Sequence, residues 1–179
     1  MGLFTLLSLL SLSPTLLASQ PEPAKQKHFT ATAIVNTPDN TSSAFECWQM
    51  SSPFSAPSSY DGSEAGALNM HLADTTNVTY VARPPGEEYG LHTAPYAQIV
   101  VYLSGMINIA VPTKPEQQSL ILGGHNGLFF AMDTQGEGHY ATYPTNEETV
   151  GLMIPLKDGK APEHVVLDDK PCQGSSQIA

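Results

Sequence analysis

Two histidines, His92 and His139, are the side chains of this sequence best suited to proton-transfer chemistry. Each lies close to an apolar run: His92 precedes residues 98–103 and His139 opens residues 139–143. Because histidine titrates near neutral pH, two such side chains can act as general acid and general base. Phenols come from the same strands, at Tyr96, Tyr102, Tyr140 and Tyr143. We therefore predict His92 and His139 as catalytic residues of a pocket for a phenolic or quinoid substrate, which Tyr96, Gln98, Tyr102 and Tyr140 bind.

Short strands must hold these side chains in place. The run 98–103 ends at a Ser-Gly pair and is followed by the run 106–111, which predicts an antiparallel pair in a buried sheet. About ten such runs, separated by Gly- and Pro-containing turns and without a helical pattern, predict an all-β single domain, a sandwich or barrel. The expected strands are 28–35, 45–50, 67–72, 77–82, 98–103, 106–111, 119–124, 127–133, 139–143, 149–155 and 164–167. We find no internal repeat and no second domain in the sequence.

Charge and composition exclude several classes of partner. The net charge is −10, with only seven Lys and Arg residues and no basic cluster, so nucleic acids and anionic membrane surfaces are poor partners. Charged residues make up 13% of the chain. Serine, threonine, glycine, proline and asparagine are abundant instead, as is typical of extracellular all-β domains.

The first 19 residues form an uncharged, leucine-rich run that ends in small residues. This run predicts a secretory signal peptide at 1–19, cut near Ala18 or Ser19, rather than a membrane anchor, because it is short for a membrane span. Residues 20–27 are expected to be a linker, 28–172 the β-barrel domain and 173–179 a flexible tail. After removal of the leader we expect no contact with a membrane.

The two cysteines, Cys47 and Cys172, fit a secreted chain. In an oxidising lumen a single pair most simply forms one disulfide. Asn40 and Asn77 each begin an Asn-x-Ser/Thr triplet and are candidate glycosylation sites. The expected location is the secretory pathway, ending in a vacuole, in a vesicle lumen or outside the cell.

The segment GLHTAPYAQIVVYLSG, residues 90–105, resembles the first cupin motif. The alignment places His92 at the first histidine, Ala94 at the second, Gln98 at the glutamate and Gly105 at the closing glycine. The segment GEGH, which ends at His139, resembles the second motif. The resemblance implies a cupin-like jelly-roll barrel.

A cupin site presents metal ligands from facing strands, so the resemblance also implies a ligand set of His92, Gln98 and His139. The metal would be a divalent transition ion, iron, copper or manganese. Gln98 replaces a carboxylate with a neutral amide, a weaker ligand, and without a metal the two histidines keep the acid–base role. Cupins often pair through outer strands, which implies a homodimer.

Taken together, segments along nearly the whole mature chain, among them FECWQMSSPFSAPSS and GHYATYPTNEETVGLMIP, resemble secreted cupin-like fungal proteins of polyketide toxin clusters, such as those for oosporein and patulin. The resemblance implies an oxidoreductase of secondary metabolism that acts on a small hydroxylated aromatic or quinoid polyketide intermediate. The alternatives are a non-redox cyclase or isomerase, or a protein that binds a reactive intermediate, on the same fold. The third hypothesis for the function is a secreted structural or host-interaction protein without a ligand.

Overall fold

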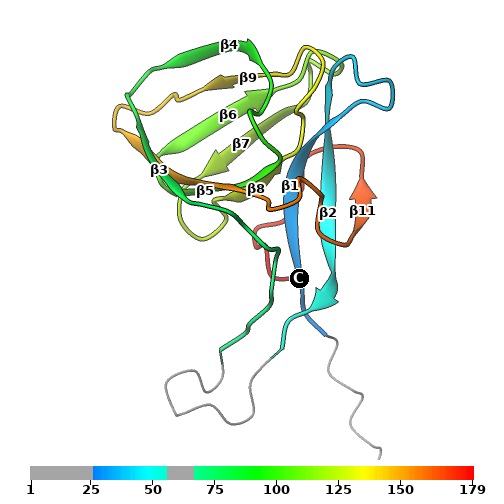
Figure 1. Cartoon of the computed structure of the whole chain (residues 1–179). Coiled ribbons are helices and arrows are strands. Elements are labelled where there is room, and N and C mark those ends of the chain that lie inside the picture. The colour runs from blue at the N-terminus through cyan, green and yellow to red at the C-terminus, as the bar shows by residue number, and fades with distance from the viewer. Residues whose placement is uncertain (1–25, 56–66) are drawn as a thin grey trace, which may run out of the picture.

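The computed structural model describes residues 26–55 and 67–179, so the predicted leader and most of the predicted linker lie outside the described residues. The described part of the chain is all-β (Figure 1). Its strands are β1 (His28–Asn36), β2 (Ser43–Pro53), β3 (Thr79–Arg83), β4 (Glu88–His92), β5 (Gln98–Ser104), β6 (Met106–Ala110), β7 (Gln118–Leu122), β8 (Leu128–Ala131), β9 (His139–Thr142), β10 (Thr149–Pro155) and β11 (His164–Asp168).

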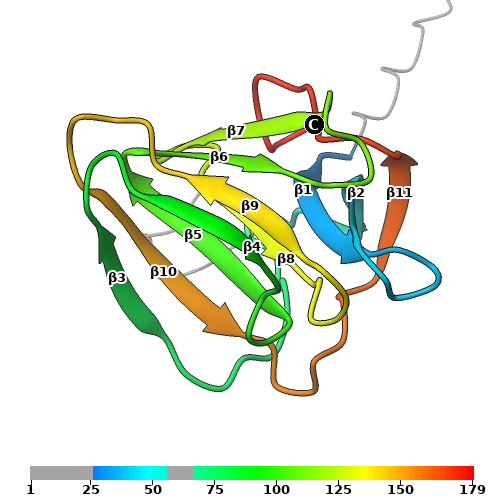
Figure 2. The ribbon, with the colours of Figure 1, turned by 90° about the horizontal axis from the view of Figure 1, so that it is seen from above.

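The strands form two sheets. The larger has the order β11-β2-β1-β8-β5-β10-β3 and the smaller the order β4-β9-β6-β7. The smaller sheet lies across one half of the larger, and β2 and β11 extend beyond it at the side (Figures 1 and 2). Among the described strands, all pairings are antiparallel except that of β1 with β8. The predicted all-β, single-domain fold is confirmed, and its two sheets are consistent with a jelly roll.

Strand β5 is buried on both faces, which explains its unbroken apolar sequence. Val100 and Tyr102 belong to the core between the two sheets. Ile99 belongs to a second core, on the opposite face, together with Trp48 and Phe130. Because successive side chains of a strand point to opposite faces, a run without alternation is the expected sequence of such a central strand.

The predicted pairing of runs 98–103 and 106–111 is wrong, because the chain changes sheets between them. β5 pairs with β8 and β10, whereas β6 pairs with β7 and β9. Gly105 makes this corner with a φ of 77°. The corner is fixed to β10 by Thr149, whose hydroxyl accepts from the Met106 N–H and donates to the Met106 carbonyl, each at 3.1 Å. Apolar runs around a Ser-Gly pair fit a hairpin and a corner equally well.

Two other strand predictions differ from the structure. Residues 67–72 do not form a strand; they make one bridge, between Asn69 and Ser55, while Met70 and Leu72 pack against the second core. Conversely, residues 88–92 form β4, although no strand was expected there. β4 is an edge strand that pairs only with β9 among the described strands, so it lacks the apolar run of a central strand.

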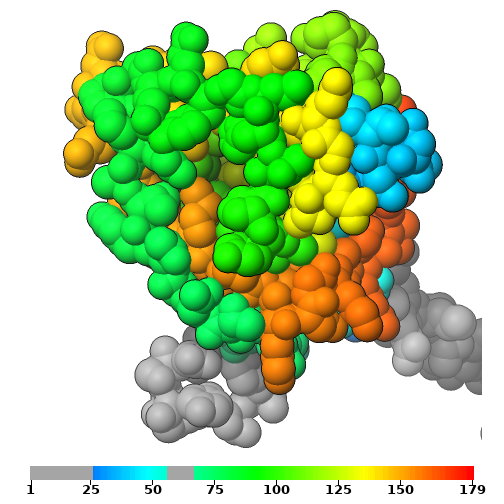
Figure 3. All heavy atoms as spheres, turned by 45° about the horizontal axis from the view of Figure 1, so that its top comes forward, coloured from blue at the N-terminus to red at the C-terminus, as the bar shows by residue number. Residues whose placement is uncertain are grey.

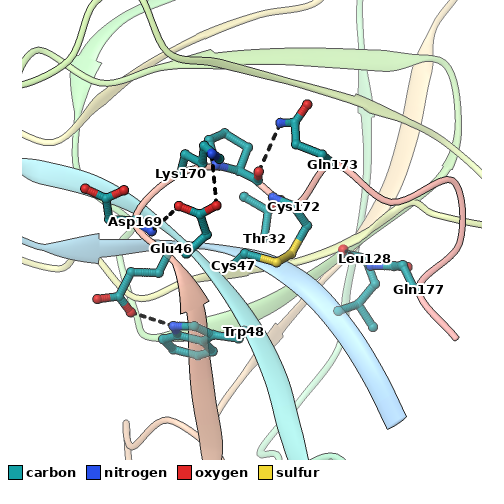
Figure 4. The surroundings of a disulfide bond; sticks show 12 residues. Thr32, Glu46, Cys47, Trp48, Leu128, Asp169, Lys170, Cys172, Gln173 and Gln177 are labelled. Atoms are coloured by element: carbon teal, nitrogen blue, oxygen red, sulfur yellow. Dashed lines mark hydrogen bonds and ion pairs between the residues drawn. A yellow bond between two sulfur atoms is a disulfide. The ribbon is translucent and has the colours of Figure 1, made fainter. Parts of the chain in front are cut away.

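The disulfide between Cys47 and Cys172 is confirmed and ties β2 to the C-terminal segment (Figure 4). Residues 173–179, predicted to be a flexible tail, are instead hydrogen bonded along β1. His28 and Ala179 exchange backbone hydrogen bonds of 2.8 and 2.9 Å, and the Gln177 carbonyl accepts from Thr30. The Gln177 side chain also donates to the Leu128 carbonyl at 2.7 Å. These bonds, together with the disulfide, make the segment part of the fold.

We predict that Gly105→Ala destabilises the protein more than Gly86→Ala. Both glycines have a positive φ, which alone costs an alanine about 1–2 kcal/mol. A Cβ at Gly105 would overlap backbone and side-chain atoms of Thr149, whereas a Cβ at Gly86 would meet nothing within 4 Å. Urea unfolding should give a loss of about 3 kcal/mol or more for Gly105→Ala, since overpacking adds its own cost. Equal losses for the two variants would contradict this account of the corner.

Candidate active site

A cavity of about 340 Å³ lies on the inter-sheet side of the larger sheet. In Figure 3 a recess is visible among the green atoms, with orange atoms of the β10 region beside it. The volume is at the small end of the range for small-molecule sites. Its lining is largely aromatic and aliphatic and includes the following polar or aromatic side chains: Asn77, Thr79, Arg83, Tyr89, His92, Thr93, Tyr96, Gln98, Tyr102, Phe129, His139 and Tyr143.

His139 is the cavity residue with the most defined hydrogen bonding. It is 6% exposed at the start of β9, and its Nδ1 lies 2.6 Å from Oδ2 of Asp133, which is fully buried. The Ser43 hydroxyl donates to the same Oδ2 at 2.7 Å. An ionised carboxylate can only accept, so Asp133 assigns a proton of His139 to Nδ1, and in the neutral ring Nε2 then has the free lone pair. Asp133 itself does not line the cavity.

His92 lies beside His139. The two residues are paired in the register of β4 and β9, and their ring centroids are 4.6 Å apart. Nδ1 of His92 is 2.7 Å from the Gly90 carbonyl. A carbonyl only accepts, so this ring also carries a proton on Nδ1, and in its neutral form Nε2 is free. The predicted pair of catalytic histidines is therefore brought together in one cavity wall.

Two tyrosines form the next polar feature of the wall. The hydroxyls of Tyr102 and Tyr143 are 2.9 Å apart, and both side chains are buried. Burial raises the pKa of the Tyr102 phenol far above its usual value, and the neighbouring Tyr143 adds to the rise. Tyr102 is thus neutral at physiological pH. Only one of the two phenol protons is used between the hydroxyls, so the other can be donated to a ligand.

The predicted substrate-binding residues divide into three groups. Gln98 and Tyr102 are buried and line the cavity. Tyr96 lines it too, but at 63% exposure it lies at the rim. The prediction for Tyr140 is wrong, because its side chain is 46% exposed and does not line the cavity. Because His139 points inward, its neighbour on β9 must point to the outer face of the sheet.

The donor set does not match that of a typical metal site. Among the described residues, no three His, Cys, Asp or Glu side chains are grouped so that they could hold a metal ion. His92 and His139 lie together, but the third predicted ligand, Gln98, offers a neutral amide. Transition-metal sites usually combine three or more imidazole, thiolate or carboxylate ligands. We therefore derive no chemical step through a metal.

Sequence reasoning missed Asp133, Ser43 and Arg83. Asp133 is a lone carboxylate at the end of the apolar run 127–133, and that was the one available signal of a buried, partnered acid. Arg83 lies just after the expected strand 77–82, but it ends β3 and lines the cavity. Ser43 is 90 residues from Asp133 in sequence, and no local pattern links them.

Both predicted glycosylation sites are accessible. Asn40 is exposed in the turn after β1, where it adopts a φ of 58°. Asn77 is exposed at the cavity. Their glycosylation stays a prediction.

The comparisons with known proteins add no family. No protein-family model matches the chain, and a search of curated proteins finds no significant match.

The described residues contain no helix with the length and apolar character that a membrane span requires.

We predict that Ser43→Ala destabilises the protein while Ser42→Ala does not. Ser43 donates to the buried Asp133, and losing that donor should cost about 1–3 kcal/mol. The Ser42 hydroxyl is also buried but has no partner among the described residues, so its removal should be neutral or slightly stabilising. Chemical denaturation of the two variants measures the difference. Equal effects would show that the Ser43 hydrogen bond does not support the carboxylate.

Proposed function

We propose that the chain is an enzyme that moves protons within a small hydroxylated aromatic or quinoid substrate, an isomerase or cyclase. The observation that carries this proposal is the buried Asp133–His139 pair on the wall of a largely apolar cavity, next to His92. The reaction class needs a positioned base and a neutral acid, and no electron acceptor.

His139 is the base of this proposal. Its Nε2 accepts a proton from a substrate hydroxyl or an activated carbon, and the resulting imidazolium lies 2.6 Å from the Asp133 carboxylate. Asp133 fixes the tautomer and the ring orientation and faces the positive charge when it forms. Oδ1 of Asp133 is buried without a partner among the described residues, which strengthens the pull of the carboxylate on a nearby cation.

The tyrosine pair and His92 complete the proton path. The hydrogen-bonded hydroxyls of Tyr102 and Tyr143 can donate one hydrogen bond to an oxygen on which negative charge develops. The proton held on His139 then returns to a different substrate atom, directly or through His92. The product is a tautomer or a ring-closed isomer of the substrate, with no change in its number of electrons.

The experiment is solvent exchange at the ring carbons of phloroglucinol, a neutral phenol whose ring protons exchange through its keto tautomer. In D₂O at neutral pH, we expect the protein to accelerate loss of the ring ¹H NMR signal. His139→Gln should lower the protein-dependent rate by about 100-fold or more, the usual contribution of a general base. Asp133→Asn should lower it too, because an amide no longer enforces the Nδ1–H tautomer.

His125→Gln is the matched control, since His125 is exposed in a loop and does not line the cavity. Its rate should equal that of the wild type. A wild-type rate equal to that of buffer, or a rate that His139→Gln leaves unchanged, would contradict the proposal.

An oxidoreductase of fungal polyketide metabolism, which the cupin-like resemblance supports, is the second candidate. Its supporting observation is that two of the three predicted metal ligands, His92 and His139, lie with ring centroids 4.6 Å apart. Elemental analysis of protein from a secreting eukaryotic host separates the two proposals. The acid–base proposal expects less than stoichiometric metal, whereas near-stoichiometric iron, copper or manganese that both His92→Ala and His139→Ala abolish would favour the oxidoreductase.

The disulfide fits an oxidising, secretory-type environment. We extend this to a vacuole, a vesicle lumen or the medium as the place of action. A phenolic or polyketide intermediate as substrate, and a homodimer as the assembly, belong to the same proposal and rest on the resemblance.

A further inference from the structure

Arg83 gives the cavity a positive charge in a strongly acidic protein. It is the only arginine in a sequence with a net charge of −10. It ends β3, at the edge of the larger sheet, where it pairs with Thr149 of β10 in the sheet register. Among the lining residues that the structure describes, it alone carries a fixed charge, and no carboxylate lines the cavity.

The guanidinium is held by aromatic rings rather than by a carboxylate. One terminal nitrogen donates to the Tyr89 hydroxyl at 2.5 Å. The central carbon lies 4.8 Å from the Tyr89 ring centroid and 6.0 Å from that of Tyr143. Among the described residues Arg83 forms no ion pair. Rings hold the plane of the guanidinium without using up its hydrogen-bond donors.

Most of the donors of Arg83 therefore remain available. A guanidinium has five N–H donors, and the Tyr89 bond is the one that Arg83 donates among the described residues. Its Nε is buried without a partner. Because this Nε has almost no accessible surface, the donors open to a ligand are those of the terminal nitrogens.

Glu87 is the acidic group close to this cluster, and it lies outside the cavity lining. Burial, and after it the nearby Glu87 side chain, raises the pKa of the Tyr89 phenol. Tyr89 therefore stays protonated. Because Glu87 does not line the cavity, an anion inside the cavity would meet the guanidinium and not a carboxylate.

Tyr89 and His92 separate Arg83 from the base. The ring of Tyr89 is 5.8 Å from that of His92, which in turn is 4.6 Å from that of His139. Arg83 and the proton-transfer pair are thus linked through the ring of Tyr89 and lie at the two ends of this series of contacts. That separation suits a molecule with a ring between its acidic group and its reactive group.

We propose that the substrate is a hydroxylated aromatic carboxylate, whose carboxylate binds Arg83 while its hydroxylated ring faces His139 and His92. This inference rests on the proposed function and narrows its substrate class. The guanidinium matches a carboxylate in plane and charge, and two parallel N–H bonds would fix the orientation of the ring.

The test compares 2,4-dihydroxybenzoate with its neutral methyl ester by isothermal titration calorimetry at low salt. We expect the acid to bind at least tenfold more tightly than the ester. Arg83→Met should lower the affinity for the acid at least tenfold and change that for the ester less than threefold. Arg83→Lys, which keeps the charge but not the planar fork, should retain part of the preference for the acid and serves as the second variant if Arg83→Met does not fold.

Lys114→Met is the control for the change in net charge, because Lys114 pairs with Asp169 and does not line the cavity. It should leave both affinities unchanged. Equal binding of acid and ester by the wild type would overturn the inference, and so would equal weakening of both by Arg83→Met. In either case, His139-dependent exchange with phloroglucinol would leave the proposed function standing, whereas loss of that exchange as well would overturn both.

Discussion

One buried carboxylate, that of Asp133, joins the two sheets and defines the site. It receives hydrogen bonds from Ser43, in the larger sheet, and from His139, in the smaller. The backbone carbonyl of Asp133 also accepts a hydrogen bond from the N–H of Ala94, in the segment that leads from β4 to β5. A charge placed in an apolar core is very costly without such partners, so the sheets must approach in the one arrangement that supplies them. The same partners fix the ring of His139 at the cavity.

The cavity depends on the point between β5 and β6 where the chain passes from the larger sheet to the smaller. If β5 and β6 had formed a hairpin within one sheet, Tyr102 and Ile107 would lie in one layer. Because Gly105 turns the chain into the second sheet, these residues instead belong to the core between the sheets and line the cavity. Two polar residues of the site are satisfied by a neighbour in this core: His139 by Asp133, and Tyr102 by Tyr143.

The sequence alone predicted the strands and the two histidines but not their setting. Apolar runs and turn residues located β1, β2 and β5 to β11 well, because burial leaves a periodic signal. Which sheet each strand joins depends on contacts between distant segments, such as Ser43 with Asp133, that no local pattern carries. His92 and His139 were recognisable because histidine chemistry is a property of the residue. Tyr140 was misplaced because one step along a strand changes the face to which a side chain points. Arg83 was missed because its lack of an ion pair among the described residues is visible only in three dimensions.

The measurement that tests the central claim most directly is the ¹⁵N NMR spectrum of the histidine rings at neutral pH, with and without phloroglucinol. We expect the neutral ring of His139 to carry its proton on Nδ1, as its bond to Asp133 requires, and the proposed base needs an unprotonated Nε2. We also expect the ligand to change the Nε2 resonances of His139 and His92 while those of His125 stay fixed. A proton on Nε2 of His139, or a ligand that leaves both cavity histidines unchanged, would contradict the claim that this pair is the proton-transfer centre.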